Sequence, residues 1–133
     1  MQIEAPSLLI TDDDRAFRET LQGVLEPQGF RTLLAGDGEQ ALSIVRNEEV
    51  HLLLLDMHMP KLTGLETLRR VKRVKSILPC ILLSAQLDDL LIEQARRAEA
   101  FSVLPKPVTM RQIIGVVRVA LERTYHWTRE RRS

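Results

Sequence analysis

The stretch LLLLDMHMP, residues 52–60, contains four consecutive leucines that end at Asp56 and are followed closely by Pro60. The apolar run does not alternate with polar residues, and its length suits a strand. Strands of this kind are typical of a parallel sheet that is covered on both faces. In open parallel sheets, ligands bind at the edge where the strands end. We therefore expect a buried central strand over Leu52–Leu55 and a functional carboxylate at Asp56.

Similar apolar runs occur at four other places, and a helix fits between each run and the next. The five expected strands are Leu8–Thr11, Arg31–Ala35, Leu52–Leu55, Cys80–Ser84 and Phe101–Leu104. The segments between them carry apolar residues at helical spacing, for example Leu65, Leu68 and Val71, or Leu87, Leu90, Leu91 and Ala95. This alternation predicts an α/β fold in which a doubly wound parallel sheet has helices on both faces.

The composition is that of one globular domain. The chain has 133 residues, of which 44% are hydrophobic and 28% are charged, and this length supports one core without staples. The net charge of +1 argues against a chain that coats nucleic acid or a membrane along its whole length. The apolar runs are far shorter than the roughly 18 residues that a membrane span needs. Cys80 is the only cysteine, so we expect a buried free thiol and a cytoplasmic location.

Positive charge is concentrated at the C-terminal end. From Arg111 onward the chain has six arginines and two glutamates, a net charge of +4, which leaves −3 for residues 1–110. The simplest expectation for residues 125–133 is a solvated basic tail or the start of a linker. The alternatives are a helix that continues into an output domain beyond Ser133, or a basic patch around Trp127 that contacts a partner.

Polar side chains follow four of the five expected strands. They are Asp12, Asp13 and Asp14 after the first strand, Asp56 after the third, Ser84 after the fourth and Lys106 shortly after the fifth. Neighbouring carboxylates repel each other unless a cation neutralises them, and all-oxygen ligands suit Mg²⁺. A divalent metal, a lysine and a hydroxyl together favour binding of a phosphoryl group. Alternatively, the acidic triplet only caps the following helix, which is the role that we expect for Asp14.

Four motifs in this order resemble the receiver domain of two-component response regulators. They are LLITDDD (residues 8–14), LLLLDMHMPKLTG (52–64), LLSA (82–85) and LPKP (104–107). The resemblance runs from about Ser7 to Thr124. It implies a flavodoxin-like receiver fold with five helices and the strand order 2-1-3-4-5. It also implies that residues 1–124 form the receiver domain and that residues 125–133 lie outside it.

The resemblance implies a role for each residue at the strand ends. Asp56 is the expected acceptor of a phosphoryl group from a sensor histidine kinase or a phosphotransfer protein. The expected ligands of Mg²⁺, or of Mn²⁺ as a substitute, are Asp12, Asp13, Asp56 and the main-chain carbonyl of His58. The expected phosphate-binding and switch residues are Ser84, Ala85 and Lys106, with a cis peptide bond between Lys106 and Pro107. The side chains of His58 and Gln86 are expected to tune how water removes the phosphoryl group.

One position departs from the family pattern. The family usually has an aromatic residue three positions before the lysine, where this chain has Val103. Period-two spacing places Phe101 on the same strand face as Val103, although not at the matching position. We therefore expect phosphorylation with a smaller or differently routed conformational response. The response is expected at the face formed by the fourth helix, the fifth strand and the fifth helix, where a partner or a second copy would bind.

Two other functions fit part of the pattern. A Mg²⁺-dependent phosphohydrolase also forms an aspartyl phosphate, but such enzymes commonly place a second Asp two residues after the nucleophile, where this chain has His58. A pseudo-receiver that only binds proteins would not need the acidic set together with Lys106. No glycine-rich nucleotide-binding loop is present in the sequence. We favour a signalling domain that phosphorylates and dephosphorylates itself and that contacts nucleic acid only through an output domain.

Overall fold

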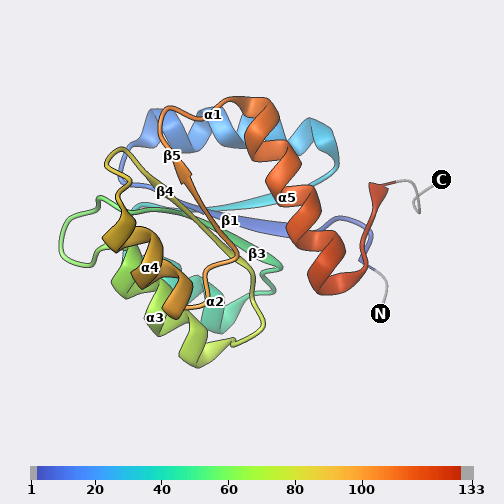
Figure 1. The fold of residues 1–133 in the computed structure, drawn as a ribbon. Coiled ribbons are helices and arrows are strands. Elements are labelled where there is room, and N and C mark those ends of the chain that lie inside the picture. The colour runs from blue at the N-terminus through green and yellow to red at the C-terminus, as the bar shows by residue number, and fades with distance from the viewer. Residues whose placement is uncertain (1–2, 130–133) are drawn as a thin grey trace.

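The structure is a computed structural model that describes residues 3–129. Strands and helices alternate along the chain, as expected (Figure 1). The strands are β1 (Ser7–Thr11), β2 (Arg31–Ala35), β3 (Leu52–Asp56), β4 (Cys80–Ser84) and β5 (Ser102–Pro105). The helices are α1 (Arg15–Leu25), α2 (Gly38–Asn47), α3 (Gly64–Val74), α4 (Asp89–Arg97) and α5 (Met110–Tyr125), with a short 3-10 helix at Glu26–Gln28.

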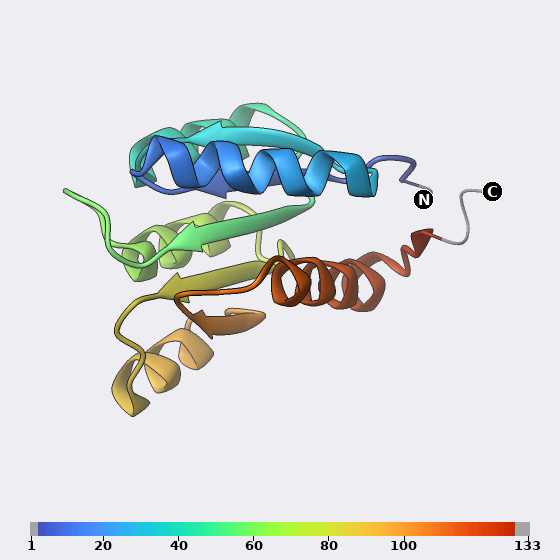
Figure 2. The ribbon, with the colours of Figure 1, turned by 90° about the horizontal axis from the view of Figure 1, so that it is seen from above.

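The strands form one parallel sheet in the order β2-β1-β3-β4-β5. Helices α1 and α5 cover one face of the sheet, and α2, α3 and α4 cover the other (Figure 1). Seen from above, the strands all point toward the same edge (Figure 2). The doubly wound fold, its five helices and its strand order are confirmed. We call the edge where the strands end the carboxyl edge, and the other one the amino edge.

The core explains why the central strands are apolar without interruption. Every residue of β1, β3 and β4 is buried. Alternate side chains enter different layers: Leu53 packs with α2, α3 and α4, whereas Leu54 packs with α1 and α5. Each fully buried leucine contributes roughly 1.5–3 kcal/mol relative to an exposed one. The thiol of Cys80 is buried as expected, and burial raises its pKa to about 12.

Side chains at the helix starts explain where the helices begin. Asp14 accepts hydrogen bonds from the backbone N–H groups of Ala16 and Phe17, which confirms its expected capping role. Thr63 and Thr109 each begin a helix with a capping box, in which the third residue of the helix hydrogen-bonds back to the cap. Because α3 and α5 begin directly after loops of the carboxyl edge, these caps hold that edge in place.

Two expectations about apolar faces are wrong. Phe101 precedes β5, which begins one residue later than expected, so period-two spacing does not apply to it. Phe101 packs on the α1 and α5 side, whereas Val103 packs on the opposite side. On α4, Leu90 is 66% exposed while Leu91 and Ala95 are buried. Helix α4 begins only at Asp89, and its inward face contains residues 91 and 95 but not 90.

The chain turns back on itself after α5. His126 has a left-handed backbone (φ 58°) and ends the helix. Trp127 is then buried, with its ring 5.4 Å from that of Phe30. The expected basic tail is therefore not solvated at Trp127, and its residues 130–133 lie outside the described residues. Among residues 3–129, no helix has both the length and the apolar character that crossing a membrane requires.

Candidate functional site

Three carboxylates meet at the carboxyl edge of the sheet. Asp56 is the last residue of β3, and Asp12 follows β1, whose parallel pairing with β3 brings the two residues to the same level. One carboxylate oxygen from each of Asp12, Asp13 and Asp56 lies within 4.8 Å of the others. Asp12 and Asp56 are buried, whereas Asp13 is exposed. The sequence prediction that these three residues come together is thus correct.

Gly64 keeps the loop after β3 close to this cluster. Its N–H donates to the carbonyl of Met57 at 2.9 Å. A Cβ atom on residue 64 would collide with the carbonyl oxygen of Asp56, so the close approach requires glycine. The loop that carries His58 is therefore held directly against the end of β3.

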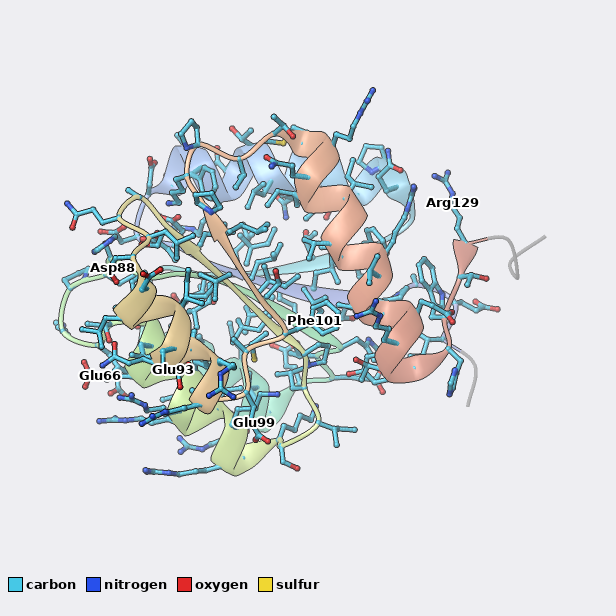
Figure 3. All side chains as sticks on the ribbon, in the orientation of Figure 1. Glu66, Asp88, Glu93, Glu99, Phe101 and Arg129 are labelled. Atoms are coloured by element: carbon cyan, nitrogen blue, oxygen red, sulfur yellow. The ribbon has the colours of Figure 1, made fainter. Side chains whose placement is uncertain are left out.

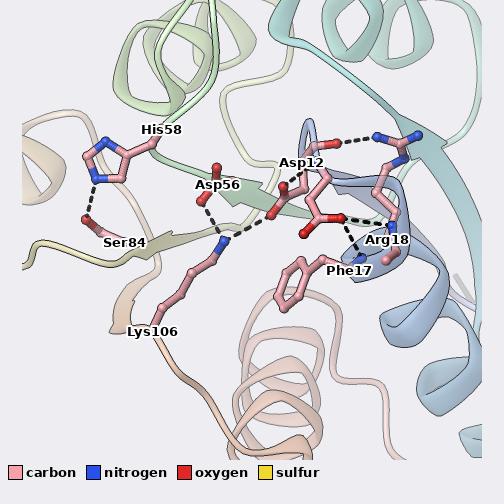
Figure 4. Close-up of polar contacts among 9 residues, drawn as sticks. Asp12, Phe17, Arg18, Asp56, His58, Ser84 and Lys106 are labelled. Atoms are coloured by element: carbon pink, nitrogen blue, oxygen red, sulfur yellow. Dashed lines mark hydrogen bonds and ion pairs between the residues drawn. The ribbon is translucent and has the colours of Figure 1, made fainter.

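Lys106 reaches the cluster from the loop after β5. Its Nζ lies 2.8 Å from Oδ1 of Asp56 and 3.1 Å from Oδ2 of Asp12 (Figure 4). The ammonium group also lies over the ring of Phe17, 4.4 Å from the centroid, which is a cation–π contact. The peptide bond between Lys106 and Pro107 is cis, as the family resemblance implies. The lysine thus links β1, β3 and α1 through one side chain.

Burial and charge shift two pKa values in the cluster. Burial raises the pKa of Asp12, against the hydrogen bonds from Asp14 and Lys106 that lower it. Burial alone would lower the pKa of Lys106, but its hydrogen bonds to Asp56 and Asp12 outweigh burial and raise it. Three carboxylates and one ammonium leave two negative charges in a small volume. Because the donors are all oxygen atoms and the charge is in excess, the site fits a hard divalent cation such as Mg²⁺.

Two residues of α1 support the cluster, and the sequence reasoning did not find them as site residues. Nη1 of Arg18 donates to the carbonyl oxygen of Asp12 at 2.6 Å (Figure 4). Phe17 supplies the ring below Lys106. The sequence contains only one signal for them: both lie on the first turns of the helix that Asp14 caps. That signal places them near the strand end without indicating which way they point.

Ser84 has other partners than the acidic cluster. Its buried hydroxyl accepts a hydrogen bond from the backbone N–H of Gln86 at 3.1 Å and lies 3.4 Å from Nε2 of His58 (Figure 4). Within residues 3–129 the hydroxyl makes no hydrogen bond to Asp56 or Lys106, although the Ser84 carbonyl accepts from the backbone N–H of Lys106 at 2.8 Å. Ala85 and Gln86 are exposed, and the Gln86 side chain makes no hydrogen bond inside this range. His58 therefore joins the β3 loop to the end of β4.

The sequence matches the family model of the response regulator receiver domain over residues 8–118. The chain belongs to this family. Among curated proteins, the receiver domain is 36% identical over 126 residues to the transcriptional regulatory protein CpxR of Klebsiella pneumoniae, covering 95% of this chain and 53% of the relative. It is 36% identical over 118 residues to the transcriptional regulatory protein AfsQ1 of Streptomyces coelicolor, covering 89% and 52%. The chain thus spans about half the length of these relatives.

Solved structures of receiver domains have the same fold. A CheY-like receiver domain protein from Methanospirillum hungatei superposes with a TM-score of 0.89 at 23% identity, covering 92% of this chain and 98% of the other. The receiver domain of an HD domain-containing protein from Pseudomonas fluorescens gives a TM-score of 0.86 at 28% identity, covering 92% and 99%. The observed strand order and helix placement are therefore those of a complete receiver fold.

Val103 distinguishes this receiver domain from the usual family pattern. It lies on β5, is partly buried and packs against the layer formed with α2, α3 and α4. Phe101, the nearest aromatic residue on this segment, packs on the opposite side of the sheet. It is therefore not placed to substitute for an aromatic residue at position 103.

Proposed function

We propose that this receiver domain accepts a phosphoryl group on Asp56 and that the phosphorylated form binds a different set of partners. The observation that supports this most strongly is the position of Lys106, whose ammonium group lies between the carboxylates of Asp12 and Asp56. A fixed cation beside a buried carboxylate offsets the repulsion between that carboxylate and an incoming phosphoryl group. The acidic cluster and the membership in the receiver family support the same proposal.

In the proposed reaction, a carboxylate oxygen of Asp56 attacks the phosphorus atom of a phosphohistidine. A P–O bond forms on Asp56 while the P–N bond to the donor imidazole breaks, and the imidazole leaves as a neutral ring after taking a proton. Water later attacks the phosphorus atom, which returns the carboxylate and releases inorganic phosphate. The domain thus catalyses both steps on its own side chain.

We propose that Mg²⁺, with Mn²⁺ as a substitute, is held by Asp12, Asp13, Asp56 and the main-chain carbonyl of His58. When bound, this cation neutralises charge on the phosphoryl oxygens. Lys106 supplies the second positive charge, and its contacts with Phe17 and Asp12 keep it oriented toward Asp56. Asp12 and Asp56 are buried, and charge interactions are stronger in such surroundings than in water.

Ser84 and Ala85 are the proposed link between the site and the surface. To contact a phosphoryl oxygen, the Ser84 hydroxyl must leave its present contacts with His58 and the N–H of Gln86. That movement would pull on the segment between β4 and α4, so the proposed responding face is α4, β5 and α5. The exposed side chains of Leu90 and Ile92 on α4 make this face suitable for a partner or for a second copy of the domain.

The proposed donor is a sensor histidine kinase or a phosphotransfer protein, and the proposed location is the cytoplasm. The two relatives named above are transcriptional regulatory proteins about twice the length of this chain. We propose that the receiver acts in the same kind of system, through an output domain or through a separate partner. A phosphohydrolase is less favoured because His58, exposed and in contact with Ser84, takes the position of the acidic residue that such enzymes use.

The test is a phosphorylation assay read by intact mass. The domain is incubated with acetyl phosphate and Mg²⁺, and we expect a gain of one phosphoryl group that is absent in Asp56→Asn and absent with EDTA. Asp13→Asn should greatly slow the reaction. Asp14→Asn is its matched control, since Asn also caps helices and Asp14 lies one residue further along. A modified Asp56→Asn protein, or equal rates for the two Asn variants at positions 13 and 14, would contradict the proposal.

A further inference from the structure

A pocket of about 490 Å³ lies at the amino edge of the sheet, far from the acidic cluster. It is formed by the last turns of α5 and by the segment that follows, and Arg129 projects from this segment (Figure 3). We call it the basic pocket, and its principal residues are Arg118, Val119, Glu122, Arg123, Trp127 and Arg129. Its volume is in the range of small-molecule sites, which are roughly 300–1,000 Å³.

The basic pocket has an excess of positive charge. Three arginines and one glutamate line it, which leaves a net charge of +2. Within residues 3–129, none of these three arginines forms an ion pair with a carboxylate. Arg118 and Arg129 instead both donate to the neutral amide oxygen of Gln28, at 2.6 and 3.2 Å. Their charges are therefore available to an anion.

Two residues that line the basic pocket each contain a buried N–H group without a partner in the described part of the chain. These groups are Nε of Arg118 and Nε1 of Trp127, and neither makes a hydrogen bond within the described residues. Trp127 is only 6% exposed, and its ring is fixed against Phe30. A buried donor without a partner costs about 1–3 kcal/mol, so native structures rarely retain one without a reason. Because protein atoms cover both groups, a ligand in the pocket would reach them only if the Arg118 and Trp127 side chains shift.

We propose that the basic pocket binds a small doubly charged oxyanion, either a phosphate or a compound with two carboxylates. The charge of the ligand would match the net charge of the pocket. Its oxygen atoms would accept from the guanidinium groups, which is the pairing that arginine favours most strongly. Val119 and Trp127 supply apolar surface for a short carbon skeleton. This ligand site is separate from phosphorylation of Asp56 and does not depend on it.

Trp127 allows the site to be tested directly, because it is the only tryptophan of the chain. The full chain is titrated with inorganic phosphate, glycerol 3-phosphate or succinate while tryptophan fluorescence is recorded. Mg²⁺ is left out, and the Asp56→Asn protein is titrated in parallel so that binding at the acidic cluster is recognised. We expect a saturable change that is the same in both proteins. Saturation by phosphates alone or by succinate alone identifies the ligand class.

Charge variants make the test specific. Arg123→Gln should weaken binding by roughly tenfold, because it removes one charged donor. Glu122→Gln should tighten binding about threefold, because it removes the only negative charge of the pocket. Arg111→Gln, an exposed arginine at the other end of α5, is the matched control and should have no effect. A fluorescence change that KCl reproduces at equal ionic strength, no saturation, or equal effects at positions 111 and 123 would overturn the proposal.

Discussion

The two edges of the sheet differ in how their charges are balanced. At the carboxyl edge, Asp12 and Asp56 share one ammonium group at 3.1 and 2.8 Å, so the buried carboxylates already have a partner inside the chain. At the amino edge, the arginines of the basic pocket have no carboxylate partner within residues 3–129, and two buried donors are unpaired. The buried carboxylates of the carboxyl edge therefore have an internal counter-charge, whereas the arginines of the basic pocket have none among the described residues.

This comparison has a simple structural cause. Parallel strands bring all their ends to one edge, and the loops that follow them in this chain carry the carboxylates. Helix α5 runs from the carboxyl edge to the amino edge and places Arg118 and Arg123 there, with Arg129 in the segment that follows. The carboxylates and these arginines therefore lie at opposite edges of one sheet.

The largest expected effect concerns the amino edge. Replacing Trp127 with Ala should lower the free energy of unfolding by about 3 kcal/mol, because a large ring packed on Phe30 would be lost. The measurement is urea unfolding followed by circular dichroism. Trp127→Phe, which keeps an aromatic ring, should lose less than half as much. Both proteins, when folded, should accept a phosphoryl group at the wild-type rate, and a slower rate would show that the two edges are coupled.

At the carboxyl edge, Asp13→Asn should stabilise the metal-free protein by about 1 kcal/mol or less, since it removes one of three mutually repelling carboxylates in an exposed position. The same change should abolish most of the stabilisation that Mg²⁺ gives the wild type. Thermal unfolding with and without Mg²⁺ measures both effects. Asp14→Asn serves as the control and should respond to Mg²⁺ as the wild type does. If Asp13→Asn is destabilising in the metal-free state, the cluster is not a site of charge repulsion.

Below pH 7, His51 should make the amino edge sensitive to acid. It is buried, its Nδ1 accepts from the N–H of Ser7 at 2.9 Å, and burial lowers its pKa. The unfolded chain therefore binds a proton near pH 6.5 that the folded chain does not yet bind. The contribution of neutral, buried His51 to the free energy of unfolding is fully present above pH 7. This contribution falls as the pH drops through 6.5, by at most about 1.4 kcal/mol per pH unit.

Urea unfolding at pH 7.5 and 5.5 tests whether the free energy of unfolding falls as the pH drops. The decrease in this free energy between the two pH values should be smaller by about 1 kcal/mol in His51→Gln than in the wild type. Asp12, whose pKa is raised, acts in the opposite direction at lower pH and is common to both proteins. Identical losses in the wild type and in His51→Gln would exclude a role for His51.

The sequence was sufficient to predict the site residues whose positions depend on where the strands end. Asp12, Asp56 and Lys106 end or follow strands, and the topology of a parallel sheet brings them together whatever the loops do. The sequence was insufficient to predict the direction in which a side chain points. Phe101 was assigned to the wrong face because the start of β5 could not be located to one residue. The position of Phe17 under Lys106 depends on how α1 lies across the sheet, which no local pattern records.

The packing of the C-terminal segment also could not be predicted from the sequence, for a different reason. Helical periodicity ends near Leu121, so the sequence pattern alone predicts a tail after it. The left-handed turn at His126 reverses the chain and buries Trp127. That burial depends on Phe30, which lies almost a hundred residues earlier in the chain. A pair so distant in sequence, with no periodicity to connect it, is visible only in three dimensions.

The smallest expected effect sharpens the description of the carboxyl edge, where His58 contacts the Ser84 hydroxyl at 3.4 Å. If the imidazole accepts a proton from attacking water, His58→Ala should lengthen the life of phosphorylated Asp56 by roughly threefold to tenfold, since general-base catalysis by an exposed group is partly replaced by solvent. Gln86→Ala should have a smaller effect in the same direction. The decay of the phosphorylated mass after removal of the donor measures both, and Lys61→Ala, an exposed change on the same loop, is the control. His58 also contacts the Ser84 hydroxyl that must move, so faster phosphorylation of His58→Ala would show that this contact restrains Ser84. An unchanged lifetime of phosphorylated Asp56 in the double variant His58→Ala/Gln86→Ala would exclude both side chains from the dephosphorylation reaction.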